Sequence, residues 1–120
     1  MSQDIKLLKK EASNAKNLRE VLELDLKYCG ETGTSMEVQD IFRDLKYKYS
    51  MDGLRKLNLD SFAFRFYNFS MQGHLQIYLD TGTDERLIKH LPELSEHYDI
   101  QLTEDNVDVR QDVVVLDVKV

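Results

Sequence analysis

The chain of 120 residues contains one cysteine, one proline and no tryptophan. A lone cysteine, Cys29, cannot form an internal disulfide, so we expect a reducing compartment and a cytoplasmic location. Apolar runs are only a few residues long, whereas a membrane span needs about 20. Charged side chains recur throughout residues 1–26, unlike the apolar stretch of a secretory signal. We therefore expect no membrane contact.

The composition fits one folded domain over residues 1–120. Hydrophobic residues make up 42%, which excludes a disordered acidic tail, and the charged fraction of 32% argues against a membrane span. The net charge of −6 is uneven, since residues 80–120 hold 11 acidic and four basic side chains. A field of that sign repels nucleic acid and attracts basic surfaces. The charge therefore predicts a protein partner with a basic surface.

Two helices are predicted in the first half. Apolar side chains at steps of three or four predict one long amphipathic helix over residues 3–29. Gly30-Glu31-Thr32-Gly33 should end it, and the capping-box spacing of Thr34 and Glu37 should start a second helix near residue 35. The short connection predicts a helical hairpin.

The first helix is longer than a domain of this size needs, which makes it the first candidate contact surface. Leu7, Val21 and Leu24 lie off its apolar stripe. Homodimerisation through this helix would bury all three side chains.

At residue 61 the apolar period changes from 3.6 to 2. Phe62, Phe64 and Phe66 then share one strand face, which we assign to the core. The remaining predicted elements are a turn at 70–73, a strand at 75–79, a helix at 83–98 that Pro92 kinks or splits at Leu91, a short strand at 100–102, and strands at 107–109 and 114–120 with a bulge or a tight turn near 110–112.

These elements define an α+β fold. The predicted order is α-α-β-β-α-β-β, with an N-terminal helical hairpin packed on a small antiparallel sheet. Residues 1–58 are mainly helical, and residues 59–120 form the ββαββ part.

No motif in the sequence predicts catalysis with its context intact. We expect no catalytic residue, no cofactor and no metal; His90, Glu93 and His97 are spaced around Pro92 as surface residues rather than as ligands. The favoured function is a non-catalytic protein-binding module, namely an adaptor, a chaperone-like protein or an inhibitor. The expected contact residues are Leu7, Val21 and Leu24 of the first helix and Asp99, Glu104, Asp105 and Asp108 of the acidic C-terminal face.

The first alternative is a single-stranded nucleic-acid binder. Residues 61–69 are similar to the aromatic strand of the RNA recognition motif, in which exposed rings stack on bases. That function needs Arg65 and Tyr67 exposed beside Lys46 and Arg43 of the basic second helix.

The second alternative is a dimeric aspartic hydrolase. The run Leu79-Asp80-Thr81-Gly82-Thr83 resembles the catalytic strand and turn of retropepsin-type aspartic proteases. The resemblance implies that Asp80 would pair with its copy across a dimer axis. The glycine-rich flap of that family has no counterpart, because no glycine follows Gly82.

Overall fold

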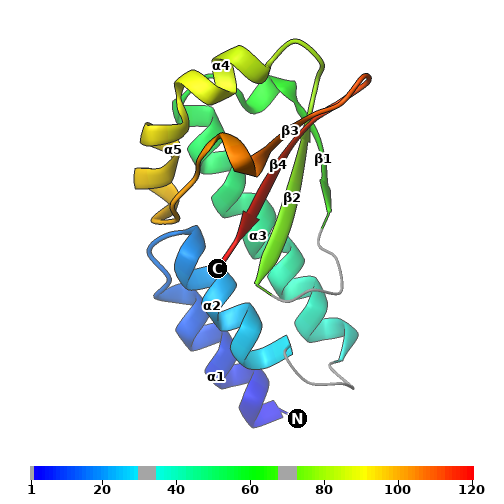
Figure 1. Cartoon of the computed structure of the whole chain (residues 1–120). Helices are drawn as coiled ribbons and strands as arrows, with labels where there is room; N and C mark the ends of the chain where they lie inside the picture. Colours follow the sequence, from blue (N-terminus) through cyan, green and yellow to red (C-terminus); the bar gives the residue numbers. More distant parts are fainter. Residues whose placement is uncertain (1, 30–34, 68–72) are drawn as a thin grey trace.

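A computed structural model describes residues 2–29, 35–67 and 73–120 of the chain. Its described part is an α+β fold, as predicted, with helices beside a four-stranded antiparallel sheet (Figure 1). The elements are α1 (Ser2–Ser13), α2 (Leu18–Cys29), α3 (Met36–Lys56), the 3-10 helix η1 (Asp60–Phe62), β1 (Ala63–Tyr67), β2 (His74–Leu79), α4 (Asp84–Lys89), α5 (Leu91–Tyr98), the 3-10 helix η2 (Glu104–Asn106), β3 (Val107–Val109) and β4 (Val114–Lys119).

The single helix predicted over residues 3–29 is wrong, because the chain breaks between α1 and α2. The Asn17 side chain accepts a hydrogen bond from the Glu20 N–H at 3.0 Å, and the Ser13 hydroxyl donates to the Lys10 carbonyl at 2.7 Å. Such short polar side chains satisfy backbone groups outside a helix and favour its ends. The two helices lie side by side (Figure 1).

Ser35 begins α3, since its hydroxyl accepts the Val38 N–H at 3.3 Å. The second helix thus starts where we expected it. The predicted cap Thr34, the helix stop at residues 30–33 and most of the turn at 70–73 lie outside the described residues.

The sheet has the order β1-β2-β4-β3, and all neighbours are antiparallel. Side chains of β2 alternate between buried and half-buried, so one face of the sheet packs on the helices. The core side chains of that face are Leu75, Ile77, Leu79, Val114, Leu116 and Val118, and they cluster with apolar residues of α2 to α5.

The strand β1 does not follow the simple alternation that the sequence predicts. Phe62 lies in η1, and a bulge shifts the register between Ala63 and Arg65. The residue between them, Phe64, is exposed rather than buried in the core. A bulge adds one residue to a strand and redirects its side chains, which explains the error.

The C-terminal third follows the prediction closely, with one exception. The third predicted helix splits into α4 and α5 beside Leu91 and Pro92. Residues 100–102 form no strand; Ile100 and Leu102 are buried in a loop that the Ser95 hydroxyl holds. Of the two options at residues 110–112, the structure shows a tight turn, closed by the Arg110 N–H and the Val113 carbonyl at 2.9 Å.

No helix within the described ranges is both long enough and apolar enough for a membrane span.

Candidate functional site

The three residues expected on the N-terminal contact surface do not share one surface. Leu7 on α1 is exposed, Leu24 on α2 is half-buried against the core, and Val21 is fully buried. A fully buried side chain cannot contact a partner, so Val21 is a core residue. The break between α1 and α2 also removes the long continuous helix on which the expected dimer depends.

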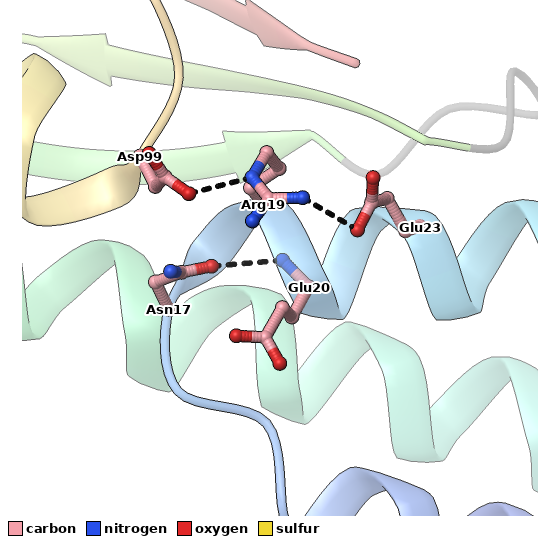
Figure 2. Close-up of polar contacts among 5 residues, drawn as sticks. All are labelled: Asn17, Arg19, Glu20, Glu23 and Asp99. Atoms are coloured by element: carbon pink, nitrogen blue, oxygen red, sulfur yellow. Dashed lines mark hydrogen bonds and ion pairs between the residues drawn. The ribbon is translucent and has the colours of Figure 1, made fainter.

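Asp99 ends α5 and contacts α2 rather than other acidic residues (Figure 2). The Arg19 guanidinium donates to Asp99 at 2.7 Å and to Glu23 at 2.9 Å. Hydrogen bonding to Asp99 raises the pKa of Arg19. This network joins the start of α2 to the end of α5, which gives Asp99 a structural contact.

Glu104, Asp105 and Asp108 lie together on one short segment, over η2 and β3, and all three are exposed. Asp108 accepts a hydrogen bond from Arg110 at 2.8 Å, which raises the pKa of Arg110. Val109, the next residue of β3, is 55% exposed. We call these four residues, Glu104, Asp105, Asp108 and Val109, the β3 edge, because β3 is the last strand of the sheet.

The opposite edge of the sheet forms an open groove against α3. Its lining comes from three elements: Arg43, Asp44 and Tyr47 of α3; Ala63, Phe64, Arg65 and Phe66 of β1; and Leu75 of β2. We call it the β1 groove. β1 has β2 as its only neighbour in the described sheet, so one side of the strand is unpaired (Figure 1).

Two large apolar side chains of the β1 groove face solvent. Phe64 is 54% exposed and Tyr47 is 51% exposed. The ring of Tyr47 packs edge-on against Phe66 with centroids 4.9 Å apart, which fixes its position beside the strand. Exposed aromatic rings held by rigid elements are typical of contact surfaces.

Charge in the β1 groove is partly uncompensated. Arg43 forms ion pairs with Asp40 at 3.2 Å and with Asp44 at 3.8 Å. Arg65 donates to the Tyr67 hydroxyl at 3.0 Å, but within the described ranges it has no ion pair. Its guanidinium is therefore available to a carboxylate.

An ion pair is buried between α2, α3 and the start of β2. Asp25 and Lys46 form an ion pair inside the protein, and Asp25 also accepts the Gly73 N–H at 2.7 Å. Cys29 lies beside them; burial, followed by the charge of Asp25, raises the pKa of its thiol to about 12. A thiol held protonated is a poor nucleophile.

The burial of Lys46 separates it from the residues of the nucleic-acid hypothesis. Arg43 and Arg65 both line the β1 groove, but Lys46 points into the core toward Asp25. The ring of Tyr67 packs against the ring of Tyr78 of β2, with centroids 5.1 Å apart. The predicted basic and aromatic cluster is thus only partly present.

Asp80 is exposed on the turn after β2, and its carbonyl accepts the Thr83 hydroxyl at 2.7 Å. The hydrolase hypothesis needs a second copy there and stays a prediction. His90 contacts Glu93 at 2.6 Å. Among the side chains that the structure describes, no three His, Cys, Asp or Glu residues gather as a metal site.

Sequence reasoning missed the buried ion pair, although its signal was present. Lys46 lies four residues from Phe42 and from Ser50, on the buried stripe of α3. Asp25 occupies the same kind of position between Leu22 and Cys29 on α2. Opposite charges on two facing apolar stripes predict a buried pair.

The comparisons with known proteins add no relative: no protein-family model, no curated protein and no solved structure matches this chain.

Proposed function

We propose that this chain is a non-catalytic protein-binding module that holds an extended segment of another polypeptide in the β1 groove. The observation that carries the proposal is the pair of half-exposed rings, Tyr47 and Phe64, beside an unpaired strand. Aromatic side chains supply much of the free energy of protein association when a partner covers them.

An extended segment suits this place because β1 is an edge strand. Backbone N–H and C=O groups on the free side of an edge strand can pair with an added strand. The bulge at Phe64 interrupts the ladder locally, so the partner gains affinity from its side chains as well as from its backbone.

The preferred partner segment has an apolar residue next to a carboxylate. Phe64 and Tyr47 offer apolar contact, and Arg65 offers a guanidinium without an ion pair in the described part of the chain. Arginine binds carboxylates through two parallel hydrogen bonds.

The acidic residues Glu104, Asp105 and Asp108 support a second contact, with a basic group of a partner. They are exposed and adjacent, and they belong to the strongly acidic C-terminal third. Charge of this kind mainly speeds association and selects partners. The proposal thus retains the acidic C-terminal contact, without Asp99, and replaces the N-terminal helix by the β1 groove.

The test is selection from a displayed library of short random peptides against the folded protein. We expect peptides with an aromatic or aliphatic residue beside Asp or Glu. Phe64→Ser and Tyr47→Ser should each weaken the selected peptides by about tenfold or more. Leu7→Ser is the matched control, because Leu7 is 50% exposed on α1, and it should leave binding unchanged.

Two results would contradict the proposal. One is a library that yields no enriched peptide on the wild-type protein, and the other is equal binding to wild type and Phe64→Ser. A labelled single-stranded oligonucleotide serves as a further probe: salt-sensitive binding that Arg65→Ala abolishes would favour the nucleic-acid alternative instead.

A further inference from the structure

We propose that the β1 groove accepts the β3 edge of a second copy of this chain, so that copies join head to tail through one continuous antiparallel sheet. The inference rests on the proposed function, because it names the occupant of the same groove. The chain itself contains a segment of the required chemistry, Val107-Asp108-Val109, which is extended and has β4 as its only partner strand in the described sheet, with α4 nearby.

Strand direction permits this joining without turning one copy end over end, so only the rotation that strand twist imposes separates neighbouring copies. The order β1-β2-β4-β3 has an even number of strands, and every neighbour is antiparallel. β1 and β3 therefore run in opposite directions. A second copy moved sideways along the sheet places its β1 antiparallel to the β3 of the first, with the helices of both copies on the same side.

One register makes the side chains complementary. If Asp108 lies opposite Arg65 of the second copy, Val109 lies opposite Phe64 and Val107 lies opposite Phe66. Asp108 pairs with Val115, and Arg65 pairs with Tyr78, so both project from the face of the sheet away from the core. Val107, Val109 and Phe66 pair with core residues and lie on the helix side, and Phe64, at the bulge, lines the β1 groove with residues of α3.

Each contact in this register gives a packing or ion-pair partner to a side chain that is exposed in the single copy. Val109 and Phe64 are 55% and 54% exposed and would cover one another. Arg65, which lacks an ion pair in the described residues, would gain the carboxylate of Asp108. Asp108 accepts from Arg110 with one oxygen, which leaves its other oxygen for Arg65.

The alternative pairing of β1 with β1 of a second copy is less favourable. Centred on Arg65, a two-fold pairing places two guanidiniums directly opposite each other, and like charges in that position destabilise a sheet. The β3-to-β1 contact instead joins two different surfaces, so a pair of copies keeps one free β1 edge and one free β3 edge. Such contacts extend into open chains, and strand twist makes these chains helical.

Charge reversal tests this contact by sedimentation and light scattering across a concentration series. The wild-type protein should form species larger than a dimer as concentration rises. Arg65→Glu and Asp108→Lys should each weaken association by at least about tenfold. The double variant Arg65→Glu/Asp108→Lys should assemble again, because its reversed charges still match.

Mixing the two single variants gives the sharpest outcome. Arg65→Glu keeps an intact β3 edge, and Asp108→Lys keeps an intact β1 groove. Because the two reversed charges also match each other, the mixture should assemble into chains in which the two variants alternate, although neither variant assembles alone. Circular dichroism and the midpoint of thermal unfolding check that each variant is folded, as expected for exposed side chains.

The inference fails if the wild type stays a monomer at every concentration, or if it forms a dimer that neither variant disturbs. Such a dimer would point to another surface; Leu7→Glu would then test α1. Failure here is separable from failure of the proposed function: a monomer that still selects peptides through Phe64 keeps the β1 groove as a binding site for other proteins.

Discussion

Asp25 and Lys46 form an ion pair with side chains that are 4% and 2% exposed. The pair joins α2 to α3, and Asp25 also accepts the backbone N–H of Gly73 before β2. Both charges are removed from water, which costs free energy that the ion pair and its hydrogen bonds must offset. The main effect of the pair is therefore to fix the relative positions of α2, α3 and the start of β2, and its net contribution to stability is small.

Removing one member of this pair should be strongly destabilising. Lys46→Met leaves the Asp25 carboxylate buried without its cation, and we expect a loss of about 3–5 kcal/mol in the free energy of unfolding. The double variant Asp25→Asn/Lys46→Met keeps an acceptor for Gly73 and removes both charges, so it should recover most of that loss. Urea denaturation measures all three proteins. A double variant no more stable than Lys46→Met would contradict this account.

The Cys29 thiol should resist alkylation in the native protein. Because burial and Asp25 raise its pKa to about 12, almost no thiolate forms near neutral pH. Iodoacetamide should label the folded protein slowly and the urea-unfolded protein rapidly. Equal rates in the two states would show that the native thiol is accessible and that its pKa is not raised.

The same pKa shift predicts a loss of stability in alkali. The unfolded thiol, with a pKa of 9.0, releases its proton before the folded one does, so the contribution of Cys29 is intact below pH 9.0 and declines from there toward about pH 12. Cys29→Ala should therefore flatten the alkaline decline in the free energy of unfolding. Burial also raises the pKa of Tyr98, whose contribution should remain in that variant.

Regular periodicity made most of the fold predictable. The apolar steps of α3, the alternation of β2 and β4, and Pro92 in the first turn of α5 all act locally, and each was placed from sequence. The break after Ser13 could not be predicted from the sequence, because an unbroken apolar stripe runs through Ala12, Ala15 and Leu18. Only the caps of Asn17 and Ser13 show that two shorter helices compete with one long helix.

The candidate site was less predictable than the fold because it depends on contacts between distant residues. Phe64 has the alternation of a core residue, and the bulge that exposes it arises from pairing with β2. Tyr47 comes from α3, sixteen or more residues earlier in the chain, and reaches the groove only in the folded state. Of the acidic residues, Asp99 pairs with Arg19, which no local pattern indicates.

The ion pair of Asp99 with Arg19 should contribute less to stability than the ability of Asp99 to adopt its backbone conformation (Figure 2). Asp99 has a φ of 58°, a left-handed conformation that asparagine tolerates and alanine does not favour. Asp99→Asn should therefore cause only a small loss of stability, and added salt should remove the difference from wild type. Asp99→Ala should lose more, at any salt concentration. Equal losses for the two variants would assign the whole effect to the ion pair.

Gly53 should be a site where alanine destabilises a helix. Alanine in place of glycine inside a helix usually gains about 0.5–1 kcal/mol. A Cβ atom at Gly53, however, would lie 2.5 Å from Cε1 of Tyr98 and 2.9 Å from Cδ2 of His97. The Tyr98 ring cannot move away easily, because its hydroxyl donates to the Ser50 carbonyl at 2.6 Å.

We therefore expect Gly53→Ala to lose about 1–3 kcal/mol in the free energy of unfolding through overpacking between α3 and α5. Asp44→Ala, at an exposed position of the same helix, should change the free energy by no more than about 0.5 kcal/mol. Urea denaturation of both variants measures the difference. A stabilised Gly53→Ala protein would mean that α3 and α5 are not in close contact at this glycine, and that the Tyr98 hydrogen bond does not hold the two helices together.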